Sequence, residues 1–92
     1  MRTIRHSDIR YVGHDLHRPE CIVAEPDGTL WVSEEGAGAV RIEPDGKQSL
    51  VGAIGGEPNG LAMDSAGRLY VANISDGRVY QLNRDGSHQV LL

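Results

Sequence analysis

Short apolar runs separated by glycine turns recur along the chain and predict β-strands. The predicted strands cover residues 9–12, 21–24, 30–33, 39–43 and 49–52, and then 60–64, 69–72, 78–82 and 88–92. Short strands at a spacing of about 8–12 residues are typical of an antiparallel meander. No segment keeps the period of about 3.6 that a helix needs over 11 or more residues. The sequence therefore predicts an all-β protein.

This pattern occurs twice, with a period close to 40 residues. With a shift of 39, Pro19, Gly28, Leu30, Val32, Gly38 and Val40 fall on Pro58, Gly67, Leu69, Val71, Gly77 and Val79. The second copy then gains one residue, so the Asp-Gly pair at 45–46 falls on the pair at 85–86. Four short strands per repeat of about 40 residues describe one blade of a β-propeller. We therefore expect residues 1–92 to form one unit of two four-stranded blades, at about 18–52 and 57–92, with residues 9–12 as an extra outer strand.

Two blades do not close a ring, because closed propellers have about 4–8 blades. Three copies of a two-blade chain would give a six-bladed ring with cyclic symmetry, so we expect a homotrimer. The alternative is that the chain is a piece of a longer propeller. In a trimer, residues 9–12 would compete with residues 88–92 for the same sheet edge, and the sequence leaves open which segment is displaced.

Strand direction alternates in a meander, so the connections fall into two sets on opposite faces. The tight turns at 26–28, 44–46, 65–67 and 84–86 form one set, and the longer connections at 13–19, 34–38, 53–59 and 73–77 form the other. The first set has turn chemistry, so its aspartates, Asp27, Asp45 and Asp85, are expected to be structural. Binding residues are more often found in longer, less regular loops such as the second set.

Within the longer connections, Glu20 and Asn59 occupy the same repeat position. Each follows the proline of its repeat and opens the inner strand, where it is predicted to face the central channel. Carboxylate and amide oxygens are hard ligands that suit Ca²⁺ or Mg²⁺. The alternative interpretation is that both side chains cap the strand and bond backbone groups.

Other chemically notable residues have simpler interpretations. His14 and His17 could ligate zinc, but no Cys or further His completes a site, so solvated loop histidines are favoured. Glu34 and Glu35 could supply a general base, and a solvated loop is the favoured alternative. Cys21 is expected to be buried packing.

Trp31 and Tyr70 share one repeat position, which favours packing between blades over ligand stacking.

Composition and charge limit the expected partners and cellular location of the protein. The net charge is −4 with no basic patch, so nucleic acid is not an expected partner. One cysteine cannot form an internal disulfide, and no apolar run approaches the roughly 20 residues of a membrane span. The N-terminus shows no apolar signal segment. We therefore expect a soluble, cytoplasmic protein of one small domain.

Several motifs resemble a known family. The segments 19–20, 26–33, 40–46 and 58–64 are similar to the senescence-marker-protein, gluconolactonase and regucalcin family of six-bladed propellers. Related strictosidine-synthase-like and NHL-repeat propellers share this blade pattern, and residues 27–33 also resemble the repeats of virginiamycin B lyase. The resemblance extends over residues 9–92.

The resemblance implies a divalent metal in the central channel; Ca²⁺ is the expected ion, and Zn²⁺ and Mg²⁺ are the alternatives. It also implies hydrolysis of a sugar lactone or related ester. Glu20 matches a metal-ligand glutamate of the family, and Asn59 matches an asparagine of its metal and substrate site. A further asparagine and an aspartate of the family lie in later blades that this chain lacks. An active ring would use Glu20 and Glu34 as catalytic carboxylates and Asn59, Asn73 and His17 as substrate contacts. The alternative is a non-catalytic repeat module that assembles with itself into a closed propeller.

Overall fold

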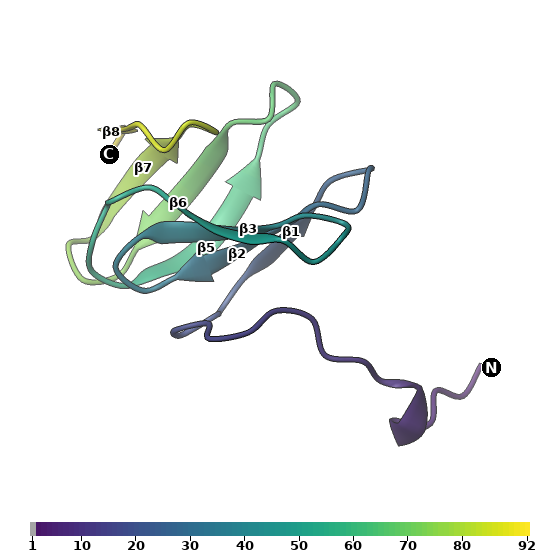
Figure 1. Cartoon of the computed structure of the whole chain (residues 1–92). Helices are drawn as coiled ribbons and strands as arrows, with labels where there is room; N and C mark the ends of the chain where they lie inside the picture. The colour runs from purple at the N-terminus through teal and green to yellow at the C-terminus, as the bar shows by residue number, and fades with distance from the viewer. Residues whose placement is uncertain (1) are drawn as a thin grey trace.

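The computed structural model describes residues 2–92 and contains two four-stranded antiparallel sheets (Figure 1). Sheet A consists of β1 (Ile22–Ala24), β2 (Leu30–Glu34), β3 (Gly38–Ile42) and β4 (Gln48–Val51). Sheet B consists of β5 (Pro58–Met63), β6 (Leu69–Asn73), β7 (Arg78–Leu82) and β8 (His88–Val90). The helical content of the described residues is one 3-10 turn, η1 (His6–Asp8). The predicted all-β class is confirmed, and these eight strands begin and end within two residues of the predicted bounds.

The predicted strand at residues 9–12 is wrong for the single chain. These residues lie outside every strand, in the segment that runs away from both sheets in Figure 1. Tyr11 is 91% exposed, and Ile9 and Val12 are exposed as well. Their composition favours a strand, but a strand forms only where a neighbouring edge accepts its backbone hydrogen bonds, and each sheet is already four-stranded without this segment.

The sequence repeat is visible in the strand register. Leu30 pairs with Ile42 in sheet A, and the equivalent pair in sheet B is Leu69 with Leu82. Val32 pairs with Val40, and Val71 pairs with Tyr80, so Val40 corresponds to Tyr80 rather than to Val79 as predicted. The extra residue of the second copy therefore lies before β7, and the shift is 40 from there on.

The turn aspartates are structural, as predicted, because each Oδ1 accepts a hydrogen bond from the backbone N–H two residues later. These bonds are 2.8 Å from Thr29 to Asp27, 2.8 Å from Lys47 to Asp45 and 2.9 Å from Ser87 to Asp85.

The two sheets pack face to face through one apolar cluster. Sheet A contributes Trp31, Ala39 and Val51, and sheet B contributes Leu69, Val71, Tyr80 and Leu82. Trp31 is fully buried there, as predicted, whereas Tyr70 at the same repeat position is half-buried and does not belong to the cluster between the sheets. Removing an aliphatic or aromatic side chain of this size from water contributes about 1.5–3 kcal/mol, so this cluster is the main source of stability of the sheet pair.

Each sheet has a second face that the other sheet does not cover. We call the residues Ile22, Leu30, Val32, Val40, Ile42 and Leu50 the open face of sheet A; pairing of these residues places them on one side of the four strands. Leu16, from the connection at 13–19, packs over the centre of this face. Its margins stay uncovered, and Ile22 is 59% exposed. The open face of sheet B consists of Gly60, Ala62, Tyr70, Ala72 and Val79, which share one side through their pairing.

Candidate functional site

The predicted site residues lie at strand ends on the face of the molecule that carries the longer connections. Glu20 precedes β1, Asn59 lies in β5, Glu34 ends β2 and Asn73 ends β6. His17 belongs to the connection before β1. Direct hydrogen bonds join His17 and Glu34 to each other.

Glu34 is a buried carboxylate, only 3% exposed, that holds the connection at 13–19. Its Oε2 accepts the backbone N–H of His17 at 2.8 Å, and its Oε1 lies 2.9 Å from Nδ1 of the same residue. The imidazole itself is largely exposed. The favoured interpretation of Glu34 as a solvated loop residue is therefore wrong. Both carboxylate oxygens bind this connection, so the geometry assigns Glu34 a structural task.

Asn73 is the repeat equivalent of Glu34 and performs the same task in sheet B. It is 4% exposed, and its Oδ1 accepts the backbone N–H of Glu57 at 2.9 Å and the Ser75 hydroxyl at 3.1 Å. Its Nδ2 donates to the carbonyl of Gly55 at 3.1 Å. Leaving a buried polar group without a partner costs about 1–3 kcal/mol, so these bonds fix the connection that leads into β5.

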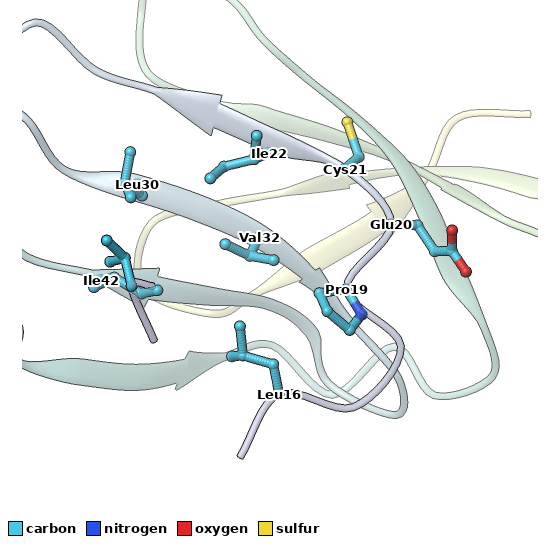
Figure 2. Close-up of a pocket in the computed structure, with 9 residues that line it drawn as sticks. Leu16, Pro19, Glu20, Cys21, Ile22, Leu30, Val32 and Ile42 are labelled. Carbon is cyan, nitrogen blue, oxygen red and sulfur yellow. The ribbon is translucent and has the colours of Figure 1, made fainter. Parts of the chain in front are cut away.

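Glu20 is an exposed residue with a cationic neighbour. Its Oε1 lies 3.6 Å from Nη2 of Arg18, and Nη1 of the same guanidinium lies 2.9 Å from Oε1 of Glu57. Figure 2 shows the Glu20 carboxylate directed away from the apolar side chains around Val32. A guanidinium beside a carboxylate repels a divalent cation, so Arg18 would have to move before a metal could bind Glu20.

Asn59 is half-buried in β5, where the register of pairing with β6 shifts between Pro58 and Gly60. A β-bulge re-aims the side chain of the extra residue, which is a common device at binding sites. Across residues 2–92, no group of three or more His, Cys, Asp or Glu side chains is placed to hold a metal ion. Metal binding by Glu20 and Asn59 stays a prediction.

An ion pair with two hydrogen bonds lies at the opposite rim and joins the two sheets. Arg84, in the turn after β7, donates to both carboxylate oxygens of Glu25 at 2.8 and 3.1 Å. The same carboxylate accepts the indole N–H of Trp31 at 2.7 Å, and the guanidinium lies 5.2 Å from the Trp31 ring centroid. The hydrogen bond from Arg84, followed by that from Trp31, lowers the pKa of Glu25.

Sheet B repeats this acid-aromatic pair without the contact between sheets. Asp64, equivalent to Glu25, accepts the hydroxyl of Tyr70 at 2.7 Å and Nε of Arg68 at 2.7 Å, both from its own sheet. The Tyr70 hydrogen bond is the main cause that lowers the pKa of Asp64 to about 2. Sequence reasoning missed these clusters, although Glu25 and Asp64 are separated by the repeat shift of 39 and so are Trp31 and Tyr70.

The open faces carry shallow apolar hollows. The hollow on sheet A, about 310 Å³, lies between Leu16 and Pro19 on one side and Ile22, Leu30 and Val32 on the other (Figure 2). The hollow on sheet B, about 290 Å³, is lined by five small or apolar residues of its open face and by Leu61. Neither hollow has the convergent polar groups of a catalytic pocket, so both fit packing partners better than a polar substrate.

Two comparisons bear on identity. No protein-family model and no curated protein matches this chain. Within residues 2–92, no helix has the length and apolar character needed to cross a membrane. The arrangement of the two open faces is therefore the main guide to function.

Proposed function

We propose that this chain is a self-assembling repeat unit, three copies of which associate head to tail into a closed six-bladed propeller. One observation carries the proposal. The two open faces are the repeat equivalents of the two faces that already pack against each other inside one chain.

The open face of sheet A corresponds to the face that sheet B presents to sheet A. At shifts of 39 and 40, Ile22, Leu30, Val32, Val40, Ile42 and Leu50 fall on Leu61, Leu69, Val71, Tyr80, Leu82 and Val90. The first five of these sheet B residues pack in the cluster between the sheets. The open face of sheet A therefore has the composition of a face that binds another sheet.

The open face of sheet B corresponds in the same way to the face that sheet A presents to sheet B. Tyr70 falls on Trp31, and Val79 falls on Ala39, both of which are buried between the sheets. Ala72 falls on Ser33, which is also fully buried. Sheet B of one copy can thus lie on sheet A of the next copy with the geometry that sheet A and sheet B already have.

The connections support the same arrangement. The connection at 53–59 bonds the preceding sheet, through Ile54 N–H to the Ala37 carbonyl at 2.9 Å, and its own sheet, through Ile74 N–H to the Glu57 carbonyl at 3.0 Å. The equivalent connection at 13–19 bonds its own sheet, through Glu35 N–H to the His17 carbonyl at 3.0 Å. No preceding sheet exists for it within the described residues. A second copy would supply that sheet.

Head-to-tail contacts form a closed ring only when the rotation between copies divides a full turn, and otherwise they form an open filament. Rings of about 4–8 blades close, so three two-blade copies fit the range.

Mass in solution tests the proposal. Light scattering should give about three times the 10.0 kDa chain mass. Ile22→Asp, on the open face of sheet A, should yield single chains, because its equivalent Leu61 packs between sheets and a buried aspartate there would lack a partner.

Ile74→Asp is the matched control, since Ile74 is 56% exposed but lies on neither open face. Its equivalent Glu35 stays exposed although the sheets are packed, so this variant should still assemble. A wild-type chain that remains a monomer at high concentration, or equal loss of assembly in both variants, contradicts the proposal.

The metal-assisted lactone hydrolysis implied by the family resemblance remains a prediction. Glu34 and Asn73 use their polar atoms on the connections, and Arg18 lies beside Glu20, so no contact among these residues favours it. Assay of the purified protein with gluconolactone and added Ca²⁺, Zn²⁺ or Mg²⁺ tests it. Absence of hydrolysis removes the enzyme prediction and leaves the assembly proposal unchanged.

A further inference from the structure

Residues 9–12 are the repeat equivalent of β4. The pair Val12-Gly13 falls on Val51-Gly52 at the shift of 39 that relates the two sheets. Gly13 and Gly52 share a left-handed backbone, with φ of 89° and 100°. The two segments thus agree in sequence and in backbone conformation. Residues 9–12 therefore correspond to the outer strand of a sheet that would precede sheet A.

The contacts of the two glycines agree with this equivalence. A Cβ on Gly13 would lie 3.2 Å from Cδ1 of Ile42, and a Cβ on Gly52 would lie 2.8 Å from Cδ1 of Leu82, the repeat equivalent of Ile42. The segment that starts at Gly13 therefore crosses the open face of sheet A in the same way as the segment that starts at Gly52 crosses the equivalent face of sheet B.

The crossing is anchored to sheet A. The backbone of His14 exchanges two hydrogen bonds with the side chain of Gln48, with His14 N–H donating to Oε1 at 3.2 Å and Nε2 donating to the His14 carbonyl at 2.7 Å. Leu16 packs on the same face. The start of the crossing is thus fixed where the outer strand of a preceding sheet would end, while residues 10–12 make no backbone hydrogen bond with another described residue.

In sheet B the equivalent position is taken by β8. The pair Leu82 with His88 repeats the pair Ile42 with Gln48, and Tyr80 with Val90 repeats Val40 with Leu50. β8 is three residues long and exposed throughout. Its first two residues, His88 and Gln89, have little preference for strands, whereas Ile9, Tyr11 and Val12 are strong strand formers.

We propose that, in the assembled ring, residues 9–12 of one copy replace β8 of the neighbouring copy and pair with that copy's β7. The inference rests on the head-to-tail association proposed above. The register follows from the equivalent pairs in sheet A. The pair of Arg41 with Ser49 corresponds to Gln81 of the neighbouring copy with Arg10. The pair of Ala39 with Val51 corresponds to Val79 of the neighbouring copy with Val12.

Both segments run antiparallel to β7, so only one of them can occupy its free edge in that register. Residues 9–12 lead directly into the connection at 13–19, which lies on the open face of sheet A. Their strand-forming side chains are exposed in the single chain. The exchange therefore buries apolar surface and completes the partner's sheet, and it releases the more polar β8.

Two cysteine pairs in a Cys21→Ala background distinguish the alternatives. The exchange variant carries Arg10→Cys and Gln81→Cys, and the matched variant carries Gln81→Cys and Gln89→Cys, since Gln81 and Gln89 are directly opposed in the single chain. Opposed residues of antiparallel strands have Cα atoms about 4.5–5.5 Å apart, within the range of a disulfide. The mass of each variant is measured before oxidation, so a failure to assemble is recorded separately.

The assembled exchange variant should give covalent multimers on a non-reducing gel, while the matched variant stays mostly reduced. An assembled ring in which the exchange pair stays reduced and the matched pair closes within one chain overturns the strand exchange and leaves the ring intact. A wild-type chain that does not assemble refutes the ring and the exchange together.

Amide hydrogen exchange on the unmodified protein gives an independent readout. On assembly, the amides of residues 10–12 should become protected and those of residues 88–90 should exchange faster. Protection of residues 88–90 with unprotected residues 10–12 in the assembled protein overturns the inference.

Discussion

Two equivalent strands, β2 and β6, differ in burial although they share the same repeat pattern. In β2 the four residues from Trp31 to Glu34 are all buried. In β6 burial alternates, with Leu69, Val71 and Asn73 buried while Tyr70 is half-buried and Ala72 exposed. β2 is covered on one side by sheet B and on the other by Leu16, whereas β6 is covered by sheet A alone.

The difference follows from the layers that cover each strand, because the two strands share the same sequence pattern. An antiparallel strand with one solvated face alternates between buried and exposed residues, and a strand between two layers does not. The exposed positions of β6 are the equivalents of buried positions of β2. In the proposed assembly, a second copy would cover these positions.

Trp31→Ala and Tyr70→Ala test this comparison, and they should show the largest difference in stability. Trp31→Ala removes a fully buried ring from between the sheets and should lower the free energy of unfolding by about 3–5 kcal/mol. Tyr70→Ala should cost clearly less in the single chain, where Tyr70 is half-buried and its main polar contact is the hydrogen bond to Asp64. Urea unfolding at concentrations too low for assembly measures both, and equal losses would contradict the assigned difference between the two faces.

Gly52→Ala and Gly46→Ala compare the crossing between the sheets with a free turn. Both glycines have positive φ, but a Cβ on Gly52 would lie 2.9 Å from the Ala37 carbonyl oxygen, while a Cβ on Gly46 meets nothing within 4 Å. Overpacking should make Gly52→Ala about 1–3 kcal/mol more destabilising than Gly46→Ala. Thermal and urea unfolding check the ranking, and a larger loss for Gly46→Ala would show that the crossing does not constrain the sheet pair.

Arg84→Ala and Arg68→Ala compare an ion pair between sheets with one inside a sheet. Arg84 binds Glu25 through two hydrogen bonds and lies over the Trp31 ring, so its loss should cost about 1 kcal/mol. Arg68 pairs with Asp64 on a more exposed surface and should cost less. The difference in unfolding free energy at neutral pH measures this, and a larger effect of Arg68→Ala would be inconsistent with it.

The loss of stability in acid should distinguish the Glu25 cluster from the Asp64 cluster, and it is the smallest of the expected effects. The folded-state pKa of Glu25 is lowered from 4.5, so its contribution to stability is present above that pH and is lost as the pH falls through the folded value. Asp64, with a pKa of about 2 against 3.8, loses its contribution at lower pH, between about 3.8 and 2. Arg84→Ala should flatten the first loss and leave the second. An unchanged acid profile in that variant would show that Arg84 does not set the Glu25 pKa.

The strand pattern could be predicted from the sequence because it depends on local features. Alternating apolar residues and Asp-Gly turns placed eight strands within two residues of their bounds. Residues 9–12 carry the same local features and still form no strand, because a strand also needs backbone hydrogen bonds to a neighbouring strand and none of the eight strands pairs with this segment.

The candidate site was less predictable, because the partner of a polar side chain depends on which loops meet. Glu34 and Asn73 differ in charge, and their common task appears only when the connections at 13–19 and 53–59 are seen to approach the strand ends. The repeat shift of 39 between these two residues was a usable signal for a shared role. The ion pair of Glu25 with Arg84 spans 59 residues of sequence, and no local pattern indicates it.

A mixture of two interface variants tests the central claim most directly. Ile22→Asp disables the open face of sheet A, and Ala72→Glu disables that of sheet B; Ala66→Glu, in an exposed turn, is the matched control for the second. Each interface variant alone should be a monomer by sedimentation equilibrium, and the control should assemble like the unmodified chain. Mixing the two interface variants should give a dimer of about twice the 10.0 kDa chain mass, because one intact interface remains. Self-association of either interface variant alone, or a mixture that stays monomeric, would contradict head-to-tail assembly.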